Sequence, residues 1–357
     1  MKMMSRRFIQ QVAMTFSLLF SGFLLSAQSI SPVQIFQFSD GNSKTNTNSV
    51  PIVNDARAVS EPDLPRDAPQ NQVQDFRYFK KVATNRKSSD ATIFNAATVY
   101  LASWGLEEND FKPVNSLLQT NHAAYLVKLI RGHYFIELAW KERGSAYANQ
   151  VGASQLTNFE EKLRKAEAEL EAAWELNPKQ PLIPEEMMTV ELGQGKGRDR
   201  LELWFQRAVH LDTNNFRACR QKLYYLEPKW YGSPQDEIAF GRECVASTNW
   251  GGEIPLLLVQ AHQSLAKYLP KEKQSDYWLL PGVWEDVQSA YNKYLKAHPK
   301  DLLERSYYAV FAYSGSHWDV LNEQLLLLGS ENYRLLGDED KISDIVGAAK
   351  RHAAKSN

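Results

Sequence analysis

The chain contains only two cysteines, Cys219 and Cys244, and both fall on apolar faces of expected helices. Thiol catalysis has no support, because a reactive cysteine needs a partly exposed, electropositive setting. Two structural interpretations stay open. The thiols form a disulfide that joins two neighbouring helices, which an oxidising compartment would allow, or they are free and buried on their helices.

Net charge is also nearly absent, because 41 basic and 42 acidic side chains leave a formal charge of -1. A chain without an overall field does not recruit nucleic acid or an anionic membrane surface from a distance. We therefore expect no nucleic-acid partner. Any partner has to be recognised by local contacts.

The sequence lacks the signatures of several enzyme classes. None of its seven histidines pairs with another four residues away around a Glu, so the helical zinc-protease motif is absent and we expect no metal. The stretch GQGKGRDR, residues 193–200, lacks the Lys-Ser or Lys-Thr step of a phosphate-binding loop and follows no strand. The Gly-x-Ser-x-Gly motif and the lytic transglycosylase signature do not occur. We expect neither enzymatic activity nor a cofactor.

Two acids and one histidine receive structural interpretations. Glu185 and Glu186 are adjacent in IPEEMM, and consecutive helical side chains point about 100° apart. We expect both acids in a solvated first turn, which the helix dipole favours. His262 lies in a helix that is apolar on most sides, so we expect a core-edge histidine with one hydrogen-bond partner.

The longest apolar run is at the N-terminus, where Lys2, Arg6 and Arg7 precede it and small residues follow it. This order is typical of a secretory signal peptide, which we place at residues 1–29 with cleavage near Ala27 or Ser29. The expected location is the periplasm or the medium, with membrane contact only transient. An uncleaved membrane anchor is the alternative, because the run is long enough to span a bilayer as a helix.

Residues 30 to about 72 are rich in Asn, Ser, Asp and Pro and show no sustained apolar period. This composition predicts a flexible linker, which we place at residues 30–88. The rest of the chain, residues 89–357, is expected to form one all-α domain, because its apolar residues recur every three or four positions.

Helix starts are expected where an N-cap residue stands three before an acid, and Gly329 is expected to end a helix. The five pairs are Thr157 with Glu160, Asp199 with Glu202, Ser233 with Asp236, Asp301 with Glu304, and Ser316 with Asp319.

Three helix ends share a spacing of four, three, three and two residues. The spacing resembles the second helix of the tetratricopeptide repeat, in which small positions let paired helices lie close and a terminal Pro forces the next turn. We therefore expect stacked antiparallel hairpins in a tetratricopeptide-like right-handed superhelix, against the alternative of a compact irregular helical domain. The three sets are Ala166, Leu170, Ala173, Leu176 and Pro178; Leu201, Phe205, Ala208, Leu211 and Thr213; and Val287, Tyr291, Tyr294, Ala297 and Pro299.

Three further stretches resemble a bacterial family of exported tetratricopeptide-like proteins known only as a domain of unknown function. They are AWKERGSAYANQV at 139–151, WFQRAVHLDTNNFRAC at 204–219 and LEPKWYGSPQDEIAFGREC at 226–244. The resemblance covers roughly residues 100–300. It implies an all-helical fold and supplies no catalytic residue.

Aromatic and cationic side chains are the remaining candidates for a site, because Trp, Tyr and Arg concentrate binding energy at interfaces. We expect an interaction protein that binds a peptide or protein partner in a helical groove. The alternatives are a helical envelope enzyme that acts on glycan through carboxylates not identified here, and an architectural spacer. Packing of the corner at 226–233 is the competing interpretation for its aromatic pair. The candidate contact residues are Trp140, Arg143, Arg207, Lys229, Trp230, Tyr231 and Arg242.

Overall fold

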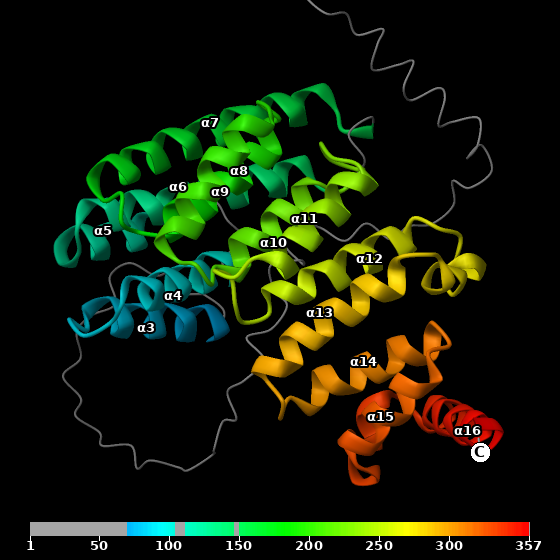
Figure 1. Cartoon of the computed structure of the whole chain (residues 1–357). Coiled ribbons are helices and arrows are strands. Elements are labelled where there is room, and N and C mark those ends of the chain that lie inside the picture. The colour runs from blue at the N-terminus through cyan, green and yellow to red at the C-terminus, as the bar shows by residue number, and fades with distance from the viewer. Residues whose placement is uncertain (1–69, 104–110, 146–149, 357) are drawn as a thin grey trace, which may run out of the picture.

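The computed structural model describes residues 70–103, 111–145 and 150–356, and all regular secondary structure in these ranges is helical (Figure 1). The all-α prediction is therefore confirmed for this part of the chain. The predicted signal peptide and most of the predicted linker lie outside the described residues.

The helices follow one another as a continuous series. The α-helices are α3 (Gln70–Thr84), α4 (Asp90–Ser103), α5 (Phe111–Asn121), α6 (Ala124–Arg143), α7 (Ala153–Leu176), α8 (Leu182–Gln194), α9 (Arg198–Leu211), α10 (Phe216–Tyr225), α11 (Pro234–Ala246), α12 (Leu257–Lys267), α13 (Val283–Ala297), α14 (Leu302–Ser314), α15 (Trp318–Leu328) and α16 (Glu339–Ser356). Short 3₁₀ turns are η2 (Ile254–Leu256), η3 (Lys271–Lys273), η4 (Asp276–Leu279) and η5 (Ser330–Leu336).

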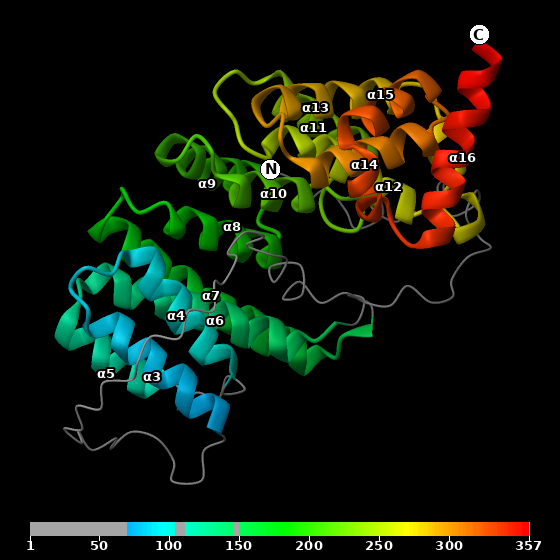
Figure 2. The same cartoon turned by 90° about the horizontal axis from the view of Figure 1, so that it is seen from below.

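Helices that are close in sequence pack together. The pairs α3 and α4, α6 and α7, α8 and α9, α11 and α12, and α14 and α15 lie against each other. Further contacts join helices two places apart, such as α6 with α8 and α8 with α10. The series runs from α3–α7 at one end of the molecule to α13–α16 at the other (Figures 1 and 2).

The helical domain begins earlier than predicted, because α3 occupies part of the expected 30–88 linker. Phe76 and Phe79 are buried, and both rings contact Tyr100 of α4, with centroids 5.3 Å and 6.0 Å away. The polar composition upstream masks this short amphipathic segment. The linker boundary at residue 88 is therefore wrong.

The repeated helix-end spacing has a common structural role. In α7, α9 and α13 the first three positions of each set are buried, and the fourth is the last residue of its helix. Close approach accompanies the pattern, because a Cβ built at Gly132 of α6 would lie 2.6 Å from Leu170 Cγ of α7.

Two of the five predicted caps are confirmed. The Ser233 hydroxyl accepts from the backbone N–H of Asp236 at 3.2 Å, and the Asp301 carboxylate accepts from that of Glu304 at 3.0 Å. Gly329 ends α15 in the left-handed region, with φ 78°.

The other three predicted caps are wrong. Thr157 lies inside α7, where its hydroxyl donates to the Ala153 carbonyl, and Asp199 is the second residue of α9. Both helices begin after a glycine, at which the backbone leaves the helical conformation sooner than the polar pattern indicates. Ser316 precedes the N-cap of α15 and instead adopts φ 61°.

The apolar interior forms three clusters in chain order. The first extends from α3 to α12, the second from η2 to α14, and the third from α14 to α16. No helix among the described residues is long and apolar enough to cross a membrane.

Gly132→Ala tests the close packing of α6 on α7. Alanine favours a helix by about 1 kcal/mol over glycine, yet we expect the variant to lower the free energy of unfolding by about 1–3 kcal/mol, because its methyl group overlaps the buried Leu170 side chain. Urea denaturation measures the change. In a Leu170→Ala background the same substitution should cost less, and equal costs in both backgrounds would contradict the proposed contact.

Candidate functional site

Five of the seven predicted contact residues converge where α6 ends and α10 turns into α11. The rings of Trp140 and Trp230 meet edge to face, with centroids 5.9 Å apart. Arg143 lies over both rings, at 5.6 Å and 6.0 Å from their centroids. Tyr231 and Lys229 complete this aromatic corner from the turn itself.

Local sequence explains how the turn is built. Leu226 is buried, and the backbone N–H of Trp230 donates to the Glu227 carbonyl at 2.9 Å. At Gly232 a Cβ would lie 2.0 Å from the Leu226 carbonyl oxygen, so only glycine fits. Ser233 then caps α11, and Pro234 occupies its first turn.

The corner combines packing with an exposed rim. Trp140 is 5% exposed and Trp230 partly buried, so both serve largely as packing, whereas Tyr231 is 45% exposed. The Tyr231 hydroxyl donates to the Leu192 carbonyl at 3.1 Å, which holds the ring against the end of α8.

Lys229 is held by its neighbours at this rim. Its ammonium lies 2.8 Å from a Glu227 oxygen and 4.3 Å from the centroid of the Tyr224 ring. Burial lowers the pKa of Lys229, but the bond to Glu227 outweighs it and raises the pKa above its ordinary value. The lysine therefore stays charged.

Arg207 and Arg242 lie elsewhere. Arg207 is stacked over Trp174 and Trp204, 4.9 Å and 4.2 Å from their centroids, and Trp204 is buried as a core residue. Arg242 pairs with Asp286, its Nε 2.9 Å from Oδ1. Neither belongs to the aromatic corner.

The prediction of solvated acids at Glu185 and Glu186 is wrong, because both are buried and form the centre of an ionic network. His133 Nδ1 lies 2.9 Å from Glu186 Oε2, and Arg217 Nη2 donates to Glu186 Oε1 at 2.5 Å. Arg217 Nη1 lies 3.4 Å from Glu185, which also accepts from Asn215 at 2.7 Å. Helix α8 is apolar on all sides around these acids, and that pattern is the signal of burial that the adjacent pair obscures.

The network shifts its titrations in opposite directions. Burial raises the pKa of Glu186, but Arg217 and His133 outweigh it and lower the value to about 2. Burial lowers the pKa of His133, but Glu186 outweighs it and raises the value. Burial raises the pKa of Glu137, one helical turn after His133. At neutral pH the arrangement favours a charged guanidinium–carboxylate–imidazolium group.

One strip of side chains joins this network to the aromatic corner. Along α6, His133, Glu137 and Trp140 follow at spacings of four and three and therefore share a face. Arg217, Gln221 and Tyr224 follow the same spacing along α10, and Gln221 donates to Thr189 of α8 at 2.8 Å. We call this face of α6, α8 and α10 the three-helix strip; it is charged at one end and aromatic at the other.

His262 is more deeply connected than predicted. It is buried and has two side-chain partners, the Tyr277 hydroxyl at 2.9 Å and Asp286 Oδ2 at 3.1 Å. Burial lowers the pKa of His262. In the described part of the chain, no group of three or more His, Cys, Asp or Glu side chains is arranged to hold a metal ion.

Cys219 and Cys244 are buried free thiols on α10 and α11. They neighbour each other, because a hydrogen bond with Cys219, together with burial, raises the pKa of Cys244. The disulfide stays a prediction.

Comparisons with models of known protein families, with curated proteins and with solved structures found no match. The resemblance to the exported tetratricopeptide-like family therefore stays a prediction.

His133→Gln should change how stability depends on pH. Because the folded-state pKa of His133 is raised, its contribution is fully present below about pH 6.5 and is lost as pH rises through the folded value. We expect the wild type to lose up to about 1.4 kcal/mol per pH unit more than the variant in this window. Urea denaturation between pH 5.5 and 9 measures the difference. His210→Gln, at an exposed position of α9, is the matched control and should follow the wild type.

Export should oxidise the cysteine pair. In protein collected from an oxidising compartment, we expect alkylation under denaturing conditions to label no thiol until reductant is added. Closure of this loop would stabilise the fold by about 3 kcal/mol. Protein made in a reducing compartment is the control and should take up two labels. Two labels on the exported protein as well would contradict the bond.

Proposed function

We propose that the chain is an exported scaffold without catalytic activity, a tetratricopeptide-like right-handed superhelix that binds an acidic peptide segment of a partner along the three-helix strip. The stacking of successive hairpins and the shared burial pattern of α7, α9 and α13 support the superhelical arrangement. The N-terminal signal pattern supports export.

The cationic rim of the strip is the observation that carries the proposal. Arg217 and Arg220 border the charged end, and Arg143 and Lys229 border the aromatic end. Burial and the neighbouring charge of Arg217 lower the pKa of Arg220, so the two guanidiniums lie close enough to repel. A carboxylate supplied by a partner would relieve that repulsion through charge-assisted hydrogen bonds.

The two ends of the strip offer different contacts. The Arg217 side chain is 34% exposed, although Glu186 beneath it is 1% exposed, so a partner would meet the guanidinium while the acid holds it in place. At the other end Tyr231 offers an exposed ring. An extended segment with an acid near one end and an apolar side chain near the other matches this order.

A glycan-cleaving enzyme is the second candidate, and one observation favours it. The pKa of Glu137 is raised while that of Glu186 is lowered to about 2, a division that acid–base catalysis uses. We rank this candidate lower, because both Glu186 oxygens are engaged by His133 and Arg217 and the side chain is nearly inaccessible.

Peptide display on the full chain tests the scaffold proposal. We expect enrichment of segments with at least two acids, and binding that weakens as salt rises. The double variant Arg220→Gln/Tyr231→Ala should bind a selected peptide at least tenfold more weakly, because it loses a charged contact and an exposed ring.

Arg207→Gln is the matched control, since Arg207 stacks on a tryptophan pair away from the strip. It should bind like the wild type. Equal losses in both variants, or selection of segments without acids, would contradict the strip as the site. Hydrolysis of a glycan that is lost in Glu137→Gln would favour the enzyme instead.

A further inference from the structure

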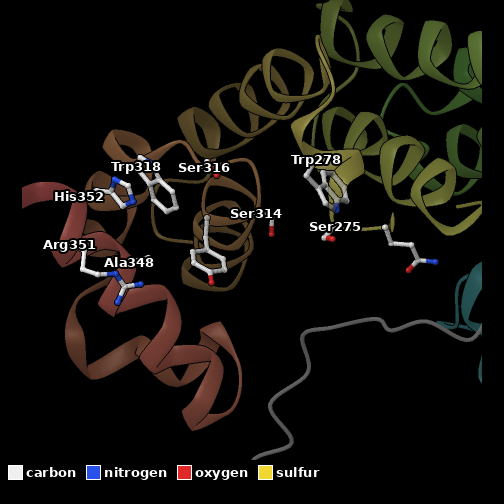
Figure 3. Close-up of a pocket in the computed structure, with 10 residues that line it drawn as sticks. Ser275, Trp278, Ser314, Ser316, Trp318, Ala348, Arg351 and His352 are labelled. Carbon is white, nitrogen blue, oxygen red and sulfur yellow. The ribbon is translucent and has the colours of Figure 1, made fainter. Parts of the chain in front are cut away.

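A cleft of about 540 Å³ opens at the C-terminal end of the molecule, remote in sequence from the three-helix strip. Its walls come from the η3–η4 segment, the end of α14, the start of α15 and the last turns of α16. Figure 3 shows Trp278 on one side, Trp318 with His352 on the other, and Ser314 between them. This volume is within the range of small-molecule sites.

Aromatic rings come to the cleft from separate elements. Trp278 packs against Phe311, with centroids 4.7 Å apart, and Trp318 is stacked on His352, 4.0 Å apart and nearly parallel. Tyr313 meets Trp318 edge on, at 6.3 Å. These contacts fix the rings before a ligand arrives. A fixed ring presents a negative face that attracts polarised C–H groups.

The polar part of the lining consists of hydroxyls and an amide. Ser275, Ser314, Ser316 and Gln274 supply groups that both donate and accept hydrogen bonds. Ala348 is the only aliphatic side chain among the ten lining residues. A peptide anchored by apolar side chains would find no aliphatic pocket here. A ligand with C–H faces and hydroxyl edges fits the alternation of rings and hydroxyls.

Arg351 sets the preferred charge. Its guanidinium makes no ion pair or hydrogen bond with the residues that the structure describes, and no lining residue is acidic. Arginine binds a carboxylate through two parallel hydrogen bonds. An unpaired guanidinium at the cleft therefore favours a ligand that carries this group.

Ser316 is an additional indication. It adopts φ 61°, and it is the only non-glycine residue with positive φ in the described ranges. The backbone N–H of His317 donates to the Ala312 carbonyl at 2.8 Å, which places Ser316 at the position after α14 where glycine is ordinarily found. A serine at this position places a hydroxyl in the cleft lining where glycine would relieve the backbone.

We propose that this cleft binds a short saccharide that carries a carboxylate, with its sugar faces on Trp278 and Trp318 and its acid on Arg351. The site is independent of the peptide-binding strip and needs no catalytic step.

Cellobiouronic acid and cellobiose form a matched probe pair, because they differ only in the carboxylate. Calorimetry and tryptophan fluorescence on the full chain measure their binding, together with a panel of hexuronate di- to tetrasaccharides and their neutral counterparts. We expect at least one acidic saccharide to bind at least tenfold more tightly than its neutral counterpart. Arg351→Gln should remove that preference, and Arg351→Lys should restore part of it.

Two further variants separate the site from general effects. Lys350→Gln removes the neighbouring charge on α16 outside the lining and should leave binding unchanged. Ser316→Gly should increase thermal stability and weaken binding several-fold, so a weaker complex would not reflect unfolding. The proposal is overturned if no acidic saccharide binds, if acidic and neutral members bind equally, if Lys350→Gln acts like Arg351→Gln, or if carboxylate-terminated peptides bind in place of saccharides.

Discussion

Each amphipathic helix of this chain has one apolar stripe, and the rest of the structure depends on the requirement that neighbouring helices cover it. A hairpin alone leaves part of that stripe in water, so stability arises from stacking. Small residues determine how closely the helices stack. Gly132 admits Leu170 between α6 and α7, and Gly193 admits Leu163 between α7 and α8, where a Cβ would lie within 3 Å of the leucine atoms.

Polar contacts provide a different set of connections. Apolar stripes join helices that are consecutive, whereas the ion pairs of His133, Glu186 and Arg217 join α6, α8 and α10, which are not. Burying such groups is unfavourable unless every charge finds a partner. Here the carboxylate is shared between an imidazole and a guanidinium, and the neighbouring Glu185 has its own bond from Asn215. The network therefore fixes the lateral register of alternate helices, a task for which non-directional apolar contacts are poorly suited.

Sequence reasoning identifies the features that depend on short-range periodicity. The apolar spacing predicts the helices, and the shared spacing of α7, α9 and α13 predicts which positions are buried. The grouping of Trp140 with Trp230 rests on a preference for aromatic and cationic residues that also selects Arg207, which lies elsewhere. Composition alone cannot separate these cases, because it contains no information on which helix faces meet.

Other features depend on contacts that are distant in sequence. The burial of Glu186 follows from partners 53 and 31 residues away, and neither separation is visible in the local pattern. The failed caps at Thr157 and Asp199 show the limit of a three-residue rule, because a preceding glycine decides where the backbone turns. The helix at Gln70–Thr84 was hidden for a similar reason: its two buried rings gain their meaning only from Tyr100 on the next helix.

The sequential order of the three apolar clusters has a mechanical consequence. No cluster spans both ends of the chain, so a force that separates the ends is carried from one hairpin to the next rather than by the whole interior at once. Such a molecule would lengthen in discrete steps, beginning with the small α14–α16 cluster, and would recover each step independently. An elastic spacer with these properties can keep a bound partner while the surfaces it connects move.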